Sequence, residues 1–379
     1  MKMNEPTLAP VHSGAKLWWA QIRSVIRLEM KKTFFAKRGL WVYVLALLPF
    51  LLFIGHALAS SHRQARRAEI AHRNEKRLTS QDLQSIKTGM TKDEVLGILG
   101  KPPVFFRWTN QKPLPEDGVV KELHENYHYS DGANDLWVEL ANDKVERVNF
   151  AIGSDVGEDA ITFAGVFQFF YLRLAVFFGC LGIFMNLFRG EVLDRSLHFY
   201  FLAPIRREVL MVGKFLAGLL ATCVIFVTSE LLQFVLFTWH FTPAARDLYL
   251  YHNHGLVDAA AYLGVTALAC LGYGAFFLAA GMLFRNPILP TAVILVWEAI
   301  NPFLPPLLKQ FSVIYYLKSL CPVGVPTPPG TPPLFAMLIS NPDPVSGVVA
   351  VLGVMTVALL ALAASSLQIR RMEINYTTE

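Results

Sequence analysis

Residues 188–218 read FRGEVLDRSLHFYFLAPIRREVLMVGKFLAG, and long apolar runs flank this stretch on both sides. Its central part is short and amphipathic and mixes basic with acidic side chains: Arg189, Arg195, Arg206, Arg207, Glu191, Asp194 and Glu208. Short loops rich in Arg and Lys between membrane helices stay in the cytoplasm. The stretch therefore predicts two membrane helices joined by a cytoplasmic loop whose mixed charges offer a soluble partner a binding surface.

The composition of the chain is that of a polytopic membrane protein. Of its 379 residues, 54% are hydrophobic and 17% are charged, against roughly 45–50% and about 25% in soluble domains. The net charge of +5 suits cytoplasmic membrane loops better than nucleic-acid binding, so no nucleic-acid partner is expected. Three of the four cysteines lie in apolar runs and no Cys-x-x-Cys occurs, so neither a disulfide framework nor a cysteine metal site is predicted.

Six apolar runs are predicted to span the bilayer, because about 20 apolar residues cross its hydrocarbon core. They are residues 40–59, 161–188, 209–239, 256–284, 288–308 and 345–367. The sequence Ala57-Leu58-Ala59 resembles a signal-peptidase site, but the basic region before it is unlike a secretory leader, so we interpret the first run as a retained span. The proline-rich residues 309–344 predict re-entrant helices that pack against the spans.

The distribution of basic residues predicts that both termini lie in the cytoplasm. Arg and Lys are frequent in residues 189–208, after residue 284 and in the tail 368–379, which are assigned to the cytoplasmic side. The short loops on the other side of the membrane contain only Arg246, Lys309 and Lys318. Residues 1–39 then form a cytoplasmic segment. Within it, apolar residues recur at three- and four-residue steps over 16–35, which predicts an amphipathic helix in the membrane interface. The polar block 60–160 is placed outside the cytoplasm.

The polar block has the pattern of a small α+β domain. Thr91 and Glu94 form a capping box for a helix over Lys92–Leu99, which Gly100 ends. Strands are predicted over 105–109 and 123–130, at the alternating Leu136, Val138 and Leu140, and after the turn at 142–143. The predicted fold class is therefore an all-α polytopic membrane protein with an inserted domain of two short helices and a three- or four-stranded antiparallel sheet.

Six residues of the loop region carry a resemblance to a known family. The chain has a Gly-Glu near the end of one span, then Pro-x-x-Arg, then Gly-Lys at the start of the next span. This order resembles the coupling region of ATP-binding-cassette type-2 (ABC-2) exporter permeases. The residues are Gly190, Glu191, Pro204, Arg207, Gly213 and Lys214. The resemblance implies a permease subunit in a bacterial inner membrane, paired with an identical or homologous permease. It also implies a separate ATPase subunit, which binds ATP and Mg²⁺ and docks on Glu191, Arg195 and Arg207.

The amphipathic helix predicted over residues 16–35 has two possible roles, which we weigh equally. In that family a comparable helix lies on the cytoplasmic surface and contacts the ATPase. The other interpretation is a simple juxtamembrane anchor.

The polar block resembles a second family. Residues 86–95 (IKTGMTKDEV) and 99–102 (LGKP) are similar to the SmpA/OmlA-type (BamE-like) lipoprotein fold. This copy lacks a lipidation cysteine in the block, so we interpret it as an insert. The resemblance implies a small envelope binding module rather than an enzyme.

The sequence contains none of three common catalytic motifs, so no enzymatic activity is expected of this chain. Gly-x-x-x-x-Gly-Lys-Ser/Thr does not occur, so ATP hydrolysis and its cofactors are assigned to the partner subunit. Neither His-Glu-x-x-His nor Gly-x-Ser-x-Gly occurs. The alternative function is an envelope scaffold that acts through its extracytoplasmic insert.

Polar residues inside the predicted spans mark either a translocation path or helix-locking ion pairs. Arg173, Glu230 and Glu298 are the three; a pair between Arg173 and one glutamate is the favoured interpretation. His124, His128, His252 and His254 lack an evident third metal ligand and are interpreted as solvated. Asp159, near the outer interface, is assigned no special role.

Overall fold

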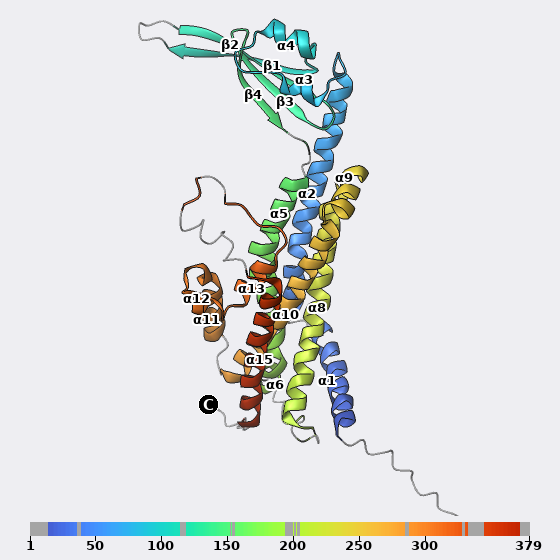
Figure 1. Cartoon of the computed structure of the whole chain (residues 1–379), viewed down its shortest axis with the longest axis vertical. Coiled ribbons are helices and arrows are strands. Elements are labelled where there is room, and N and C mark those ends of the chain that lie inside the picture. The colour runs from blue at the N-terminus through green and yellow to red at the C-terminus, as the bar shows by residue number, and fades with distance from the viewer. Residues whose placement is uncertain are drawn as a thin grey trace, which may run out of the picture. The chain divides into compact units, whose positions relative to one another are not determined.

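The computed structural model describes residues 14–35, 39–113, 119–151, 153, 156–193, 200, 202, 205–284, 288–327, 330–332 and 345–371 (Figure 1). The chain divides into two compact units. The helical unit consists of residues Met1–Leu52, Ala160–Leu236 and Asp247–Glu379, and the sheet unit of Phe53–Asp159 and Phe237–Arg246.

Five helices in the described ranges are long and apolar enough to cross a membrane. They are α2 (Leu40–Arg73), the continuous helix α5 (Val156–Gly165), η2 (Val166–Val176) and α6 (Phe177–Leu193), then α8 (Arg207–Trp239), α10 (Gly255–Leu283) and α15 (Gly347–Arg371). Five of the six predicted spans fall on these helices. The structure thus has the multi-pass helical character that the composition predicts.

The predicted span 288–308 is broken into short pieces, so a sixth spanning helix is not confirmed. The helix α11 (Ile288–Ala299) has 12 residues and is followed by η4 (Asn301–Phe303) and α12 (Pro306–Lys309). At 1.5 Å per residue, α11 is about 18 Å long, short of the roughly 30 Å of hydrocarbon. The cause is local: Pro302, Pro305 and Pro306 lack the amide hydrogens that a continuing helix needs.

Glycines on α10 allow close helix packing, because small residues let helices approach each other closely. A Cβ on Gly274 would lie 2.5 Å from Cζ of Phe184 on α6, and one on Gly272 would lie 2.9 Å from Val313. Val313 begins α13 (Val313–Leu320), which packs against α10 and α15. The predicted packing of the region after residue 308 against the spans is therefore confirmed for α13. Gly264, by contrast, has no neighbour within 4 Å of an added Cβ.

The sheet unit contains the predicted α+β domain. The helices α3 (Ser80–Gln84) and α4 (Lys92–Leu99) precede an antiparallel sheet of β1 (Val104–Pro113), β2 (Val119–Ser130), β3 (Asp135–Ala141) and β4 (Lys144–Ala151), in the order β1-β2-β3-β4. The Thr91–Glu94 capping box is present, and Leu136, Val138 and Leu140 face the core with Val95 and Leu99 of α4.

Glu125 on β2 joins three elements of the sheet unit through charged hydrogen bonds. Its Oε2 lies 2.7 Å from Nζ of Lys92 on α4, and its Oε1 accepts from Nε of Arg107 on β1 at 2.6 Å. The Tyr127 hydroxyl donates to Oε2. Burial disfavours the charged carboxylate, but these donors outweigh it and lower the pKa of Glu125 to about 2.

Stability of the sheet unit is therefore expected to fall in acid. Because the folded pKa of Glu125 lies below its unfolded value, its contribution is present above about pH 4.5 and is lost as the pH falls towards 2; it is at most roughly 3 kcal/mol. In the full chain, Glu125→Gln should lower the unfolding midpoint of the unit at pH 7 and have little effect near pH 2. Hydrogen exchange of residues 119–141 during thermal unfolding measures this, and an equal effect at both pH values would contradict it.

Candidate functional site

Four charged side chains and one tyrosine meet where α1 (Ala15–Phe35), α6 and α8 approach one another in the helical unit. At the centre is Lys214, whose side chain is 0% exposed. Its Nζ lies 2.7 Å from Oε1 of Glu29 on α1 and 2.8 Å from Oε1 of Glu191 on α6, and it donates to the Leu187 carbonyl at 3.0 Å. Three hydrogen-bond acceptors thus satisfy the three N–H groups of this buried ammonium.

Lys32 and Tyr200 close the cluster on its solvent-facing side. Nζ of Lys32 lies 3.0 Å from Oε1 of Glu191 and donates to the Tyr200 hydroxyl at 2.9 Å. That hydroxyl donates to Oε1 of Glu29 at 3.1 Å. Partial burial opposes the charge on Lys32, but the hydrogen bonds with Tyr200 and Glu191 prevail and raise its pKa. We name Glu29, Lys32, Glu191, Tyr200 and Lys214 the junction cluster.

The junction cluster contains two positive and two negative side chains and is therefore neutral as a whole. Removing one partner of a buried pair leaves an uncompensated charge, which costs about 3–5 kcal/mol. The cluster consequently fixes α1 to the ends of α6 and α8 more strongly than exposed ion pairs, worth about 0–1 kcal/mol each, would do.

Tight packing next to the cluster holds α1 against α8. A Cβ added to Gly213 would lie 3.0 Å from both Cβ and Cγ1 of Val25, which is buried on α1. The guanidinium of Arg206 lies 5.1 Å from the centre of the Trp18 ring. A glycine at 213 is thus required by close approach of the two helices rather than by its backbone angles.

Arg207 at the start of α8 contacts the end of the last helix. Its Nη1 donates to the carbonyls of Ile369 at 3.4 Å and Arg370 at 3.2 Å, and the neighbouring Glu208 pairs with Arg370 at 2.8 Å. A cation at the C-terminus of a helix satisfies its free carbonyls and complements its dipole. The structure therefore joins α8 to α15 as well as to α1.

The structure brings together only part of the predicted coupling residues. Glu191, Gly213 and Lys214 belong to or border the junction cluster, and Arg207 lies on the contact with α15. Glu191, predicted to face an ATPase, is 7% exposed and paired within the chain. Gly190 has open space where a Cβ would be. Arg195 and Pro204 lie outside the described residues.

Three members of the junction cluster were not predicted from the sequence: Glu29, Lys32 and Tyr200. One local signal existed, since Glu29 is the single acidic residue in the otherwise basic helix 15–35 and stands three positions before Lys32. Its partner Lys214 is 185 positions away, however, and no local pattern predicts that pairing.

The favoured ion pair of Arg173 with a glutamate is wrong for the described residues. No contact of 4.0 Å or less joins Arg173 to Glu230 or Glu298 there; instead its guanidinium lies 5.4 Å from the Phe169 ring centre. Lys318, buried on α13, lies 5.7 Å from the same ring.

Glu298 anchors the region after the short helix α11. Its carboxylate accepts hydrogen bonds from the backbone N–H groups of Val313 and Ile314 at 3.0 and 2.9 Å and from the Ser312 hydroxyl at 2.9 Å. It thereby caps the N-terminus of α13, where free N–H groups favour negative charge. Glu230 is fully buried on α8, and neither of its carboxylate oxygens has a hydrogen-bond partner among the described residues.

Two of the four histidines that were interpreted as solvated are instead packed on the sheet. His124 is buried and stacks on Trp108, and His128 stacks on Trp137 and lies 3.0 Å from Oδ1 of Asp135. Both are cross-strand partners of these tryptophans, and such pairs stabilise sheets. His252 and His254 are exposed, as expected.

Comparisons with protein-family models, curated proteins and solved structures find no match for this chain.

Proposed function

We propose that the chain is the membrane-spanning permease subunit of an ATP-driven ABC-2-type exporter, with both termini in the cytoplasm. The junction cluster is the observation that carries this proposal. Glu191 and the Gly213-Lys214 pair, which belong to the predicted coupling region, meet there. Both contact α1, the helix that the sequence predicts to be amphipathic. A permease without its own ATPase needs such a rigid connection, because a force applied at its cytoplasmic surface must reach the spanning helices.

The proposed coupling follows from the contacts of Lys214. Residues 194–206 connect the end of α6, which carries Glu191, to the start of α8, so an ATPase that binds this segment would displace Glu191 and Lys214 together. Glu29 and Lys32 would carry α1 with them, since the cluster joins α1 to both helices. The ATPase dimer, on binding ATP and Mg²⁺, would thus tilt α6 and α8 as one body with α1.

We propose further that α11, α12 and α13 enter the membrane from one side as re-entrant helices. They would take the place of a continuous sixth spanning helix. Non-helical backbone is tolerated at membrane depth only where protein satisfies its polar groups. Glu298 supplies this for the start of α13, and α10 and α15 pack against that helix.

Orientation is the step of the proposal that a single experiment decides. In a variant whose native cysteines are replaced, we expect Arg195→Cys to react with a membrane-impermeant maleimide only after the cells are opened. Glu146→Cys, whose position is exposed on β4 of the sheet unit, is the matched control and should react in intact cells. Labelling of residue 195 in intact cells would overturn the proposal.

Co-purification then tests the partner. The chain solubilised in mild detergent should retain an ATP-binding subunit with a Walker motif, and its ATP hydrolysis should respond to the permease. Purification without any such subunit, from membranes that contain it, counts against an exporter.

One observation favours the second function, an envelope scaffold that acts through the sheet unit. Phe105 and Phe106 on the edge strand β1 are 58% and 68% exposed, and Trp108 on the same strand is 39% exposed. Exposed aromatic side chains on a sheet edge are typical of binding surfaces. Capture of an envelope protein that depends on Phe106, in the absence of an ATPase, would support this function instead.

A further inference from the structure

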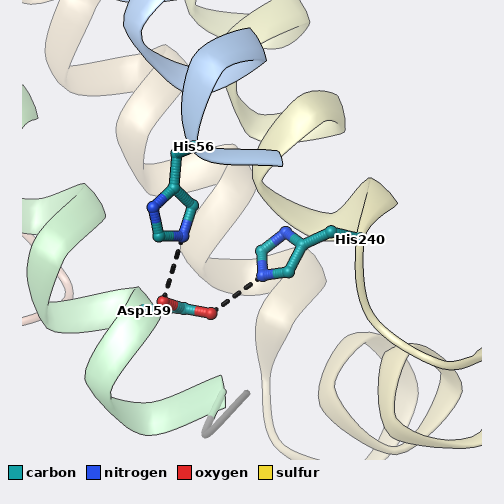
Figure 2. A group of neighbouring side chains, drawn as sticks. All are labelled: His56, Asp159 and His240. Atoms are coloured by element: carbon teal, nitrogen blue, oxygen red, sulfur yellow. Dashed lines mark hydrogen bonds and ion pairs between the residues drawn. The ribbon is translucent and has the colours of Figure 1, made fainter. Parts of the chain in front are cut away.

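Two histidines and an aspartate from distant parts of the chain converge in the sheet unit (Figure 2). Nε2 of His56, on α2, lies 3.3 Å from Oδ1 of Asp159, at the start of α5. Nε2 of His240, one residue beyond α8, lies 2.8 Å from Oδ2 of the same carboxylate. Figure 2 shows both rings turning a nitrogen towards Asp159, and one ligand atom from each residue lies within 4.8 Å of the others. Asp159 thus has a specific role, contrary to the interpretation from sequence.

We propose that His56, Asp159 and His240 form a binding site for an exchangeable divalent transition-metal ion of the zinc class. Two imidazole nitrogens and one carboxylate oxygen are the donors that Zn²⁺ accepts, whereas Mg²⁺ and Ca²⁺ prefer oxygen ligands alone. Three protein ligands leave the fourth tetrahedral position for water or another group. The site does not depend on the proposed export function.

The donor atoms lie close enough for a tetrahedral ion to draw them together. With metal–ligand distances of about 2.0–2.1 Å, neighbouring ligand atoms stand roughly 3.3 Å apart. The two imidazole nitrogens contact different oxygens of Asp159, at 3.3 and 2.8 Å, and one donor atom from each residue lies within 4.8 Å of the others, so an ion held through one carboxylate oxygen requires the side chains to close in by about 1 Å. The rings of His56 and His240 are 5.3 Å apart and nearly perpendicular, so they do not block each other's nitrogens.

The surroundings of the site predict moderate affinity and ready exchange. His56 is 35% exposed at its side chain, so an ion can enter, whereas His240 is 0% exposed. Nδ1 of His240 is buried without a hydrogen-bond partner among the described residues. Metal-ligating histidines usually donate this second N–H to an acceptor, and loss of such an acceptor weakens metal binding by about 10–100-fold. We therefore expect micromolar rather than tighter binding.

Binding of the metal alone to the full chain tests the proposal. Tag-free protein in detergent, freed of metal with a chelator, should bind one Zn²⁺ per chain in titration calorimetry. One equivalent of Co²⁺ per chain should bind in the same way and produce the visible absorption bands of a tetrahedral Co²⁺ complex. A His124→Gln background removes a second group of potential ligands, His124, Glu139 and Glu146.

His56→Gln and His240→Gln should each weaken Zn²⁺ binding by at least about 100-fold, because they remove a ligand itself rather than its support. His62→Gln is the matched control, since His62 is exposed on the same helix α2 and should leave binding unchanged. The proposal is overturned if Zn²⁺ does not bind, or if both ligand variants bind it as the control does. In that event the three residues serve only to hold their chain segments together by hydrogen bonds.

Asp159→Asn separates metal binding from simple helix pairing. An asparagine keeps a hydrogen-bond acceptor for one imidazole but loses the charge that holds a metal. We expect it to reduce Zn²⁺ affinity at least about 10-fold while the metal-free chain retains its unfolding midpoint. Unchanged affinity in this variant would remove Asp159 from the site and contradict the assignment.

Discussion

Replacing Lys214 with methionine is expected to destabilise the helical unit by about 3–5 kcal/mol. The change removes the cation between Glu29 and Glu191 and leaves two buried carboxylates with Lys32 alone as counter-charge. Methionine fills nearly the same space, so the loss is electrostatic rather than a loss of packing. Thermal unfolding of the full chain in detergent measures the effect, and α1 should detach first, as increased hydrogen exchange over 15–35.

Two further variants show whether charge balance is the cause. Lys32→Met should cost only about 1 kcal/mol or less, because the Lys32 side chain is 50% exposed and water replaces its contacts. Adding Glu191→Gln to Lys214→Met restores neutrality with Glu29 and Lys32 and should recover much of the loss. A Lys214→Met chain as stable as the unaltered protein would show that the cluster does not hold the helices together.

Replacing Gly213 with leucine is expected to displace α1 from α8. The added Cβ alone meets Val25 at 3.0 Å, and the rest of the side chain has no room between the helices. Overpacking of this kind typically costs about 1–3 kcal/mol. Hydrogen exchange of residues 15–35 should therefore increase, and in the proposed exporter ATP hydrolysis should continue without transport.

Gly190→Leu is the matched control, because the same substitution on α6 meets no atom within 4 Å of its Cβ. It should leave exchange over 15–35 unchanged, and leucine in place of glycine favours the helix by up to about 1 kcal/mol. Equal effects of the two substitutions would mean that α1 is not held by close packing at residue 213.

The elements that the sequence predicts well are those set by neighbouring residues. The Thr91–Glu94 capping box and the alternation at residues 136–140 determine their helix and strand within a few positions, and the long apolar runs determine five helices. The predicted span 288–308 corresponds to the short helix α11, η4 and α12, because Pro302, Pro305 and Pro306 interrupt the helix that apolar composition alone favours.

The parts that could not be predicted depend on residues far apart in the chain. Motif spacing found Glu191 and Lys214, but their burial follows from α1 folding against them, which the sequence does not specify locally. His56, Asp159 and His240 show the same limit more strongly. His56 lies near the end of the apolar run 40–59, Asp159 just before the run 161–188 and His240 just after the run 209–239, and only the tertiary structure makes them neighbours.

The neutrality of the junction cluster has a consequence for energised membranes. Moving one net elementary charge through 100 mV takes about 2.3 kcal/mol. Lys32 and Lys214 offset Glu29 and Glu191, so a displacement of these four side chains as one body carries no net charge across the field. The cluster itself therefore adds no voltage dependence to a joint motion of α1, α6 and α8, whereas Arg23, Arg27 and Lys31 of α1, which lie outside the cluster, carry net positive charge.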